Sequence, residues 1–193
     1  MAKNIKKASY NPLLLGIIAI LAITVLVLSY KLSLLSNGAS MFTHPQLGYT
    51  LIVPTDWNAR IYHSPAGAAV VPYEDVIILS PDYMQRAEGV APEIAKGASI
   101  FIRGAETSYK STEERFQNNA VAQRIAKDVK RITVAGNPAI QYSYTVDGES
   151  ATNVTLVKDG IWYLIKFQYA DENAYQQYKA AFEEVINNFV PKG

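Results

Sequence analysis

The sequence predicts an α+β domain, an antiparallel β-sheet flanked by helices, that follows an N-terminal transmembrane helix. Three observations lead to this prediction. An unbroken uncharged run begins at Leu13 and ends at Leu28. Strand-like segments joined by tight turns fill residues 131–169, and an amphipathic helix closes the chain. Strands joined by short turns pair as antiparallel neighbours, and the helices have to bury their apolar stripes on the resulting sheet.

The apolar run is long enough to cross a membrane. As a helix rising ~1.5 Å per residue, residues 10–30 span roughly 30 Å, about the thickness of a hydrocarbon core. Lys3, Lys6 and Lys7 precede the run, and the positive-inside rule then predicts a cytoplasmic N-terminus and a C-terminal domain outside the cytoplasm. Gly38-Ala39-Ser40 leaves open a cleaved secretory signal, because signal peptidase recognises such small residues.

These features divide the chain into four parts. We expect a cytoplasmic basic N-terminus at residues 1–9, a transmembrane helix at 10–30, a spacer at 31–45 and an extracytoplasmic domain at 46–190. Beyond Lys31 the chain carries 14 Lys and Arg residues against 17 Asp and Glu residues, a formal charge of −3. This acidic balance argues against a nucleic-acid partner. The chain has no cysteine, so the domain depends on its core rather than on disulfides.

The first half of the domain contains four strand-like segments with an irregular stretch among them. Residues 47–53 are rich in β-formers and are predicted to form a strand that stops at Pro54. We predict further strands at residues 59–63, 76–79 and 98–103. Between the last two, residues 80–97 carry two prolines and two glycines among weakly periodic residues. We interpret this stretch as irregular.

A helix is predicted to start at Ser111. Glu114 stands three positions later and completes a capping box, in which the two side chains accept hydrogen bonds from free backbone N–H groups of the first turn. Phe116, Ala120, Val121 and Ile125 follow at helical spacing and are expected to face the sheet; these four form its predicted apolar side.

The second half of the domain reads as four antiparallel strands and a helix. The strands are predicted at 131–134, 139–146, 152–158 and 161–169, and Asp147-Gly148 and Asp159-Gly160 stand at two of the joints. Such pairs tolerate the positive φ of tight hairpins. A single apolar stripe then predicts a helix that begins at Asp171 or Asn173 and ends at Pro191. The stripe consists of Tyr175, Tyr178, Phe182, Val185, Ile186 and Phe189.

Four segments together resemble the PsbP-like superfamily. They are Gly48-Tyr49 through Pro54-Thr55-Asp56-Trp57, Gly136-Asn137-Pro138-Ala139-Ile140, Trp162-Tyr163-Leu164-Ile165-Lys166-Phe167, and Phe182 with Ile186-Asn187-Asn188-Phe189. The likeness covers most of residues 46–190. It implies an α/β/α sandwich around an antiparallel sheet, and binding or scaffolding rather than catalysis. No functional residue is carried over, because these motifs are a strand end, a turn, a strand and a core helix.

The sequence contains no recognisable catalytic, metal or cofactor motif. His44 and His63 are the two histidines, too few for a multi-histidine metal site. His44 lies in the segment that leads into the first strand, and His63 is expected to be structural or exposed. We therefore predict no catalytic residue, no metal ligand and no cofactor. The favoured function is a membrane-anchored accessory or binding domain that contacts another extracytoplasmic or membrane protein, or a ligand. The alternative is an extracytoplasmic hydrolase-like enzyme without a known motif.

The predicted contact surface lies in the irregular region between Tyr62 and Tyr109. Prolines limit regular structure there, while several large side chains belong to no clear core pattern. We therefore expect Tyr62, Tyr73, Tyr83 and Met84 to contact a partner. Most of the other tyrosines, including Tyr142, Tyr144 and Tyr169, fall on the apolar faces of predicted strands and helices and are assigned to the core.

Overall fold

The computed structural model describes residues 17, 20–26, 28–29, 38–62, 74–85 and 94–192, with the side chain of Tyr62 excepted. The chain divides into two compact units, Met1–Gly38 and Ala39–Gly193. The described residues of the first unit are helical up to residue 29. In the described parts of the chain, no helix is both long and apolar enough to cross a membrane. Most of the membrane helix predicted at 10–30 lies outside the described residues, as does His63.

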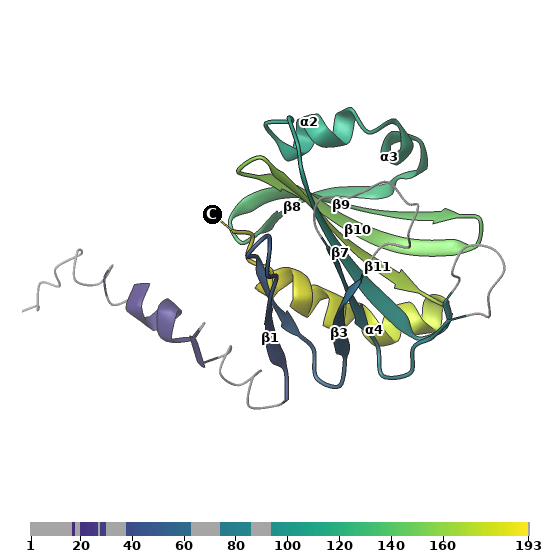
Figure 1. Cartoon of the computed structure of the whole chain (residues 1–193), viewed down its shortest axis with the longest axis horizontal. Coiled ribbons are helices and arrows are strands. Elements are labelled where there is room, and N and C mark those ends of the chain that lie inside the picture. Colours follow the sequence, from purple (N-terminus) through teal and green to yellow (C-terminus); the bar gives the residue numbers. More distant parts are fainter. Residues whose placement is uncertain are drawn as a thin grey trace, which may run out of the picture. The chain divides into compact units, whose positions relative to one another are not determined.

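The second unit is built on a seven-stranded antiparallel sheet (Figure 1). In spatial order its strands are β3 (Asn58–Tyr62), β4 (Asp75–Leu79), β7 (Ala98–Glu106), β11 (Ile161–Tyr169), β10 (Glu149–Lys158), β9 (Asn137–Val146) and β8 (Lys127–Val134). Two small ribbons accompany it, β1 (Ser40–Thr43) with β2 (Thr50–Val53) and β5 (Met84–Gln85) with β6 (Ile94–Lys96). The helices are α2 (Thr112–Gln117), α3 (Ala120–Ile125) and α4 (Glu172–Asn188). The predicted antiparallel sheet flanked by helices is confirmed.

Two hairpins of the second half have the predicted turn chemistry. Asp147 and Gly148 have φ values of 51° and 83°, and Asp159 and Gly160 have 49° and 77°. Positive φ at both central residues is the conformation that suits the right-handed twist of the flanking strands. These turns set the register in which β10 pairs with both β9 and β11.

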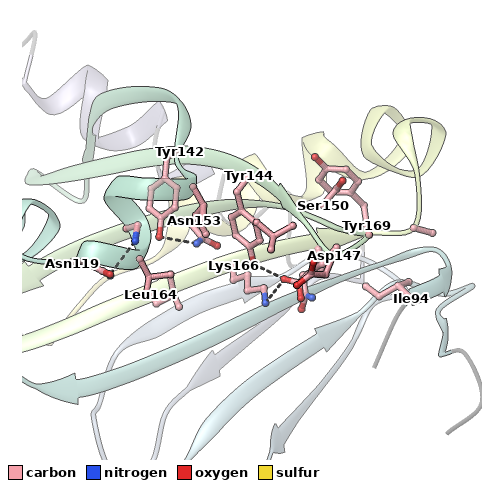
Figure 2. A pocket seen from close by; sticks show the side chains of 18 residues that line it. Ile94, Asn119, Tyr142, Tyr144, Asp147, Ser150, Asn153, Leu164, Lys166 and Tyr169 are labelled. Carbon is pink, nitrogen blue, oxygen red and sulfur yellow. Dashed lines mark hydrogen bonds and ion pairs between the residues drawn. The ribbon is translucent and has the colours of Figure 1, made fainter. Parts of the chain in front are cut away.

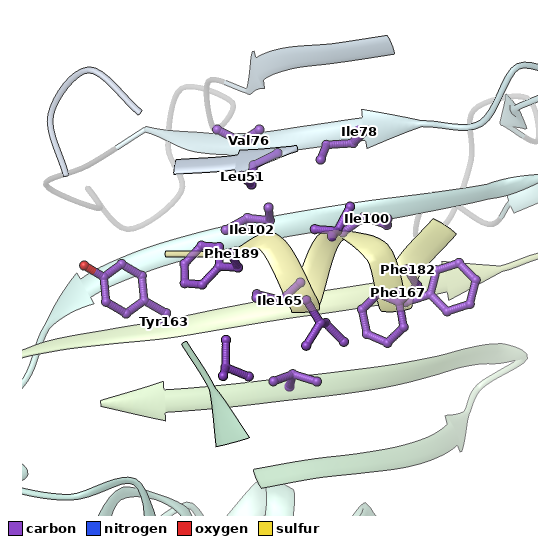
Figure 3. Close-up of a cluster of buried hydrophobic side chains, with 14 of the residues drawn as sticks. Leu51, Val76, Ile78, Ile100, Ile102, Tyr163, Ile165, Phe167, Phe182 and Phe189 are labelled. Carbon is purple, nitrogen blue, oxygen red and sulfur yellow. The ribbon is translucent and has the colours of Figure 1, made fainter. Parts of the chain in front are cut away.

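The main hydrophobic core lies between α4 and one face of the sheet. Apolar residues of β4, β7, β11 and β10 point toward this helix (Figure 3). Phe182 of α4 stacks on Phe167 of β11, with 4.8 Å between ring centroids and 14° between ring planes. At the end of the helix, Phe189 packs against Tyr49 and Tyr163. The predicted apolar stripe of this helix is therefore a core face, and Asp171 caps its start by accepting a hydrogen bond from the Ala174 N–H at 2.9 Å.

The second compact unit includes residues that the sequence assigned to the spacer. Strand β1 lies inside the range assigned to the spacer, where it pairs with β2. His44 then turns the chain between the two strands: its ring is fully buried, its Nδ1 accepts from the Leu47 N–H at 3.0 Å, and its Nε2 lies 2.9 Å from the Glu74 carbonyl oxygen. With Nδ1 accepting, the Nε2–H is the donor in that contact. This histidine therefore has a structural role.

Two sequence-based assignments are wrong in detail. The helix after Ser111 is broken into α2 and α3, because Asn118 ends the first and the Asn119 side chain caps the second by accepting from the Ala122 N–H at 3.0 Å. This break rotates the apolar face, so Ala122 is buried and Val121, expected to face the core, is 58% exposed. The stretch 80–97, expected to be irregular, contains the β5–β6 ribbon.

Candidate functional site

The second face of the sheet is only partly covered. Helices α2 and α3 lie over β9 and β10 there (Figure 1), and a small cluster of Phe116, Ala122, Ile140 and Tyr142 holds them. A cleft of about 800 Å³ remains beside α3. It is lined by α3, by β9, β10 and β11, by the Asp147-Gly148 turn and by Ile94 of β6 (Figure 2). This volume lies in the range of small-molecule sites, ~300–1,000 Å³.

The register of the sheet determines which side chains form the floor of the cleft. Tyr142 pairs with Asn153, and Asn153 pairs with Lys166. Residues that pair directly across antiparallel strands project from the same face, so these three side chains form one row. Tyr144 lies two residues after Tyr142 in β9, so its side chain projects from the same face of the sheet.

Asn153 is the most informative side chain of this row. The residue is only 5% exposed. Its Nδ2 donates to the Tyr142 hydroxyl at 2.9 Å, but its Oδ1 is buried and has no hydrogen-bond partner among the described residues. Turning the amide over would leave Nδ2 as the free group instead. In both orientations one polar atom is left over, which costs about 1–3 kcal/mol unless something else satisfies it.

A cluster of ionisable groups occupies the other end of the floor. Lys166 Nζ lies 2.7 Å from Glu149 Oε1, and the Tyr144 hydroxyl donates to the same oxygen (Figure 2). Burial alone would raise the pKa of the Glu149 carboxyl, but the hydrogen bonds from Lys166, Tyr144 and Gln168 and the charge of Lys166 together hold the pKa below its ordinary value. Burial, together with the neighbouring carboxylate, raises the pKa of Tyr144. The cleft therefore holds a carboxylate, an ammonium group and a neutral phenol that satisfy one another.

The upper edge of the cleft is apolar. Val121 of α3 and Val146 at the end of β9 are exposed there, and Ile125 and Ile94 complete this rim. A ligand would thus meet apolar side chains at the entrance and polar ones at the floor.

The four predicted contact residues do not form this site. Met84 is 59% exposed on β5, and Tyr83 beside it is partly buried. The backbone of Tyr62 ends β3 opposite Asp75, while Tyr73 lies outside the described residues. Met84 and Tyr83 lie on or next to the ribbon whose second strand supplies Ile94 to the cleft. Their role as contacts stays a prediction.

Sequence reasoning missed the cleft because it assigned the tyrosines by strand face alone. Tyr142 and Tyr144 lie on the sheet face that lines the cleft, whereas the ring of Tyr169 packs on Phe167 and Tyr175 beside the main core, as predicted. A polar residue at a buried position was the available signal: Asn153 stands between Thr152 and Val154 in β10, a strand paired on both sides.

The comparisons with known proteins identify the fold. No protein-family model matches the sequence, and no curated protein matches it significantly. The solution structure of cyanobacterial PsbP from Synechocystis sp. PCC 6803 is similar, at 12% identity and a TM-score of 0.51 over 81% of this chain and 94% of that one. A crystal structure from Bacteroides thetaiotaomicron VPI-5482 has 13% identity and a TM-score of 0.49, over 81% of this chain and 49% of that one. LpqN of Mycobacterium tuberculosis, involved in cell envelope biogenesis, has 14% identity and a TM-score of 0.45, over 80% and 91%.

The domain has a PsbP-like fold, as the resemblance of its motifs predicted. At these identities the likeness concerns the fold alone, so the function has to be argued from the cleft.

Proposed function

We propose that this chain is a membrane-anchored extracytoplasmic binding protein whose domain holds a ligand in the cleft beside α3 without converting it. The observation that carries the proposal is the buried amide of Asn153, one atom of which has no partner among the described residues while it lines a cleft of about 800 Å³. A buried polar atom without a partner costs stability. A ligand group bound to it would recover that cost.

Binding is favoured over catalysis by the way the ionisable groups are used. The Glu149 carboxylate is occupied by Lys166 and Tyr144. Its pKa is lowered and that of Tyr144 is raised, so both move away from the neutral range in which a general acid or base is effective. The enzyme alternative predicted from the sequence remains an outcome of the test.

The anchor and the location are proposed from the sequence. The apolar run from Leu13 to Leu28 and the three lysines before it support a single-pass protein with its domain outside the cytoplasm. Added protease should then remove the domain from intact spheroplasts. Protection before lysis and digestion after it would reverse the orientation, and a mature N-terminus near Met41 would replace the anchor with a cleaved signal.

The binding site is tested with the full chain in lipid nanodiscs. Ligand-observed NMR on a mixture of small polar compounds should give hits that Asn153→Leu abolishes. Asn188→Leu is a matched control, because Asn188 is equally buried but lies on α4, where its Nδ2 donates to the Glu184 carbonyl at 2.9 Å. Hits that survive Asn153→Leu would refute the site. Turnover of an ester, peptide or glycan by the purified protein would refute binding without chemistry.

Loss of binding in a Tyr83→Ala, Met84→Ala variant but not in Asn153→Leu would move the contact surface to the β5–β6 ribbon, as the sequence alone predicted. The comparison of these two variants therefore separates the cleft from the surface beside it.

A further inference from the structure

We infer that the ligand of the cleft is a neutral saccharide, a short oligosaccharide held through its hydroxyl groups; this rests on the proposed function, in which the cleft is the binding site.

The Asn153 amide in the floor of the cleft requires a ligand group that can both donate and accept hydrogen bonds. The free atom of Asn153 is an acceptor in the present orientation of the amide and a donor in the other. A hydroxyl satisfies both cases, because it has one donor and two acceptor lone pairs. Gln168, two residues from Lys166 on the same face of β11, also lines the cleft, and its amide supplies further groups of both kinds. A sugar presents several such hydroxyls around one ring.

The charges of the lining argue against an anionic ligand. Among the described residues that line the cleft, three side chains are charged: Asp147, Glu149 and Lys166. Lys166 is already paired with Glu149 at 2.7 Å, so the set has a formal charge of −1 and no uncompensated cation. A phosphate or carboxylate would have to break that pair or lie beside unbalanced negative charge. A cationic ligand would gain little, because Asp147 lies on an exposed turn, where water screens its charge.

The walls suit the apolar faces of sugar rings. Tyr144 brings an amphipathic ring to the cleft, with an apolar body and a hydroxyl end. Val121 and Val146 extend this apolar surface to the entrance. A sugar ring combines C–H faces, which pack on such walls, with an equatorial set of hydroxyls that reach the floor. A hydrocarbon chain would leave the Asn153 amide unsatisfied.

The test is calorimetric titration of the full chain, kept in a detergent without a sugar headgroup. The neutral probes are cellobiose, maltose and diacetylchitobiose, and the competing classes are adenosine monophosphate and trialanine. We expect at least one neutral disaccharide to bind, and Asn153→Leu to weaken it about tenfold, the effect of one lost hydrogen bond. Asn188→Leu should leave the affinity unchanged.

A second variant keeps the inference testable if Asn153→Leu fails to fold. Val121 is 58% exposed at the rim, so Val121→Lys should fold and place a long side chain across the entrance, with loss of saccharide binding. If none of the neutral disaccharides binds, or if neither variant weakens their binding, the inference is overturned. If adenosine monophosphate or trialanine binds instead and Asn153→Leu abolishes it, the ligand class is wrong while the cleft remains the binding site.

Discussion

Replacing Phe182 with alanine would empty the centre of the interface between α4 and the sheet. The side chain is 3% exposed and stacks on Phe167 of β11 with 4.8 Å between ring centroids. The helix cannot move inward to fill the space without displacing its other contacts, because Val185 and Phe189 on the same stripe are fully buried. The substitution should therefore leave a cavity.

The expected loss of unfolding free energy follows from this packing. Burying a phenylalanine contributes about 1.5–3 kcal/mol through apolar area alone. An aromatic pair adds about 0.5–1.5 kcal/mol, and the cavity brings the usual total for Phe→Ala to about 3–5 kcal/mol. In a domain of this size, each kcal/mol lowers the melting temperature by roughly 2–4 °C. A decrease of roughly 6–20 °C is thus expected.

Urea denaturation of residues 39–193, followed by fluorescence of Trp57 and Trp162, measures this loss. Phe182→Leu is the first control: it retains most of the apolar area and should lose clearly less. Val129→Ala is the second, because Val129 is exposed on β8 and surface changes stay within about 0.5 kcal/mol. A loss below ~1 kcal/mol for Phe182→Ala would show that this ring is not a core residue, and failure of the unmodified fragment to fold would show that the domain depends on the preceding segment.

Three further predictions concern single groups. Tyr49→Phe should leave stability unchanged or raise it by up to ~1 kcal/mol, because the buried hydroxyl has no partner among the described residues; a loss above ~1.5 kcal/mol would reveal one. Ser111→Ala should cost about 0.5–2 kcal/mol in urea denaturation, since Ser111 accepts from the Glu114 N–H at 3.1 Å; an unchanged midpoint would contradict this capping role. Glu149 has a lowered pKa in the folded state, so it stabilises the fold above its ordinary pKa of about 4.3 and loses that effect as the pH falls below it. Glu149→Gln should therefore weaken the decrease of unfolding free energy at acid pH. An unaltered dependence of unfolding free energy on pH would show that the pairing with Lys166 does not cause this decrease.

The sheet could be predicted from the sequence because its signals are local. Asp147-Gly148 and Asp159-Gly160 specify tight turns, and the alternation of apolar residues in β9 and β11 specifies which residues share a face. The stripe on α4 likewise specifies one buried side. None of these requires knowledge of distant parts of the chain.

The break between α2 and α3 shows where local signals were insufficient. Asn118 and Asn119 interrupt a pattern that otherwise continues at helical spacing, and an asparagine inside such a pattern can equally be an exposed helical residue. The Asn119 side chain accepts a hydrogen bond from the Ala122 N–H, which starts a new helix with a rotated face. That competition between a cap and a continuing helix is decided by packing on β9, which the spacing of residues does not contain.

The cleft was missed for a related reason: alternation tells which side chains lie together but not what covers them. Tyr142 is covered by Phe116, with 5.4 Å between ring centroids, whereas Tyr144 remains at the cleft. The two tyrosines of β9 therefore have the same sequence pattern and different environments. Only the placement of α2 and α3, both short, distinguishes them.

Asn153 connects stability with function in a way that can be measured. It stands on a strand paired on both sides, where asparagine is a poor strand former and an incompletely bonded amide is costly. Val154 and Leu156, on the opposite face of the same strand, are fully buried and apolar. If the amide serves a ligand, Asn153→Leu should raise the urea midpoint of the free protein while it removes binding. If the amide instead serves the fold through the Tyr142 hydroxyl, the same variant should lower the midpoint, and Tyr142→Phe should lower it too. A destabilised Asn153→Leu variant would thus show that the bond to the Tyr142 hydroxyl contributes more to the fold than the unpaired amide atom costs, and Val121→Lys would then decide whether the cleft is the binding site.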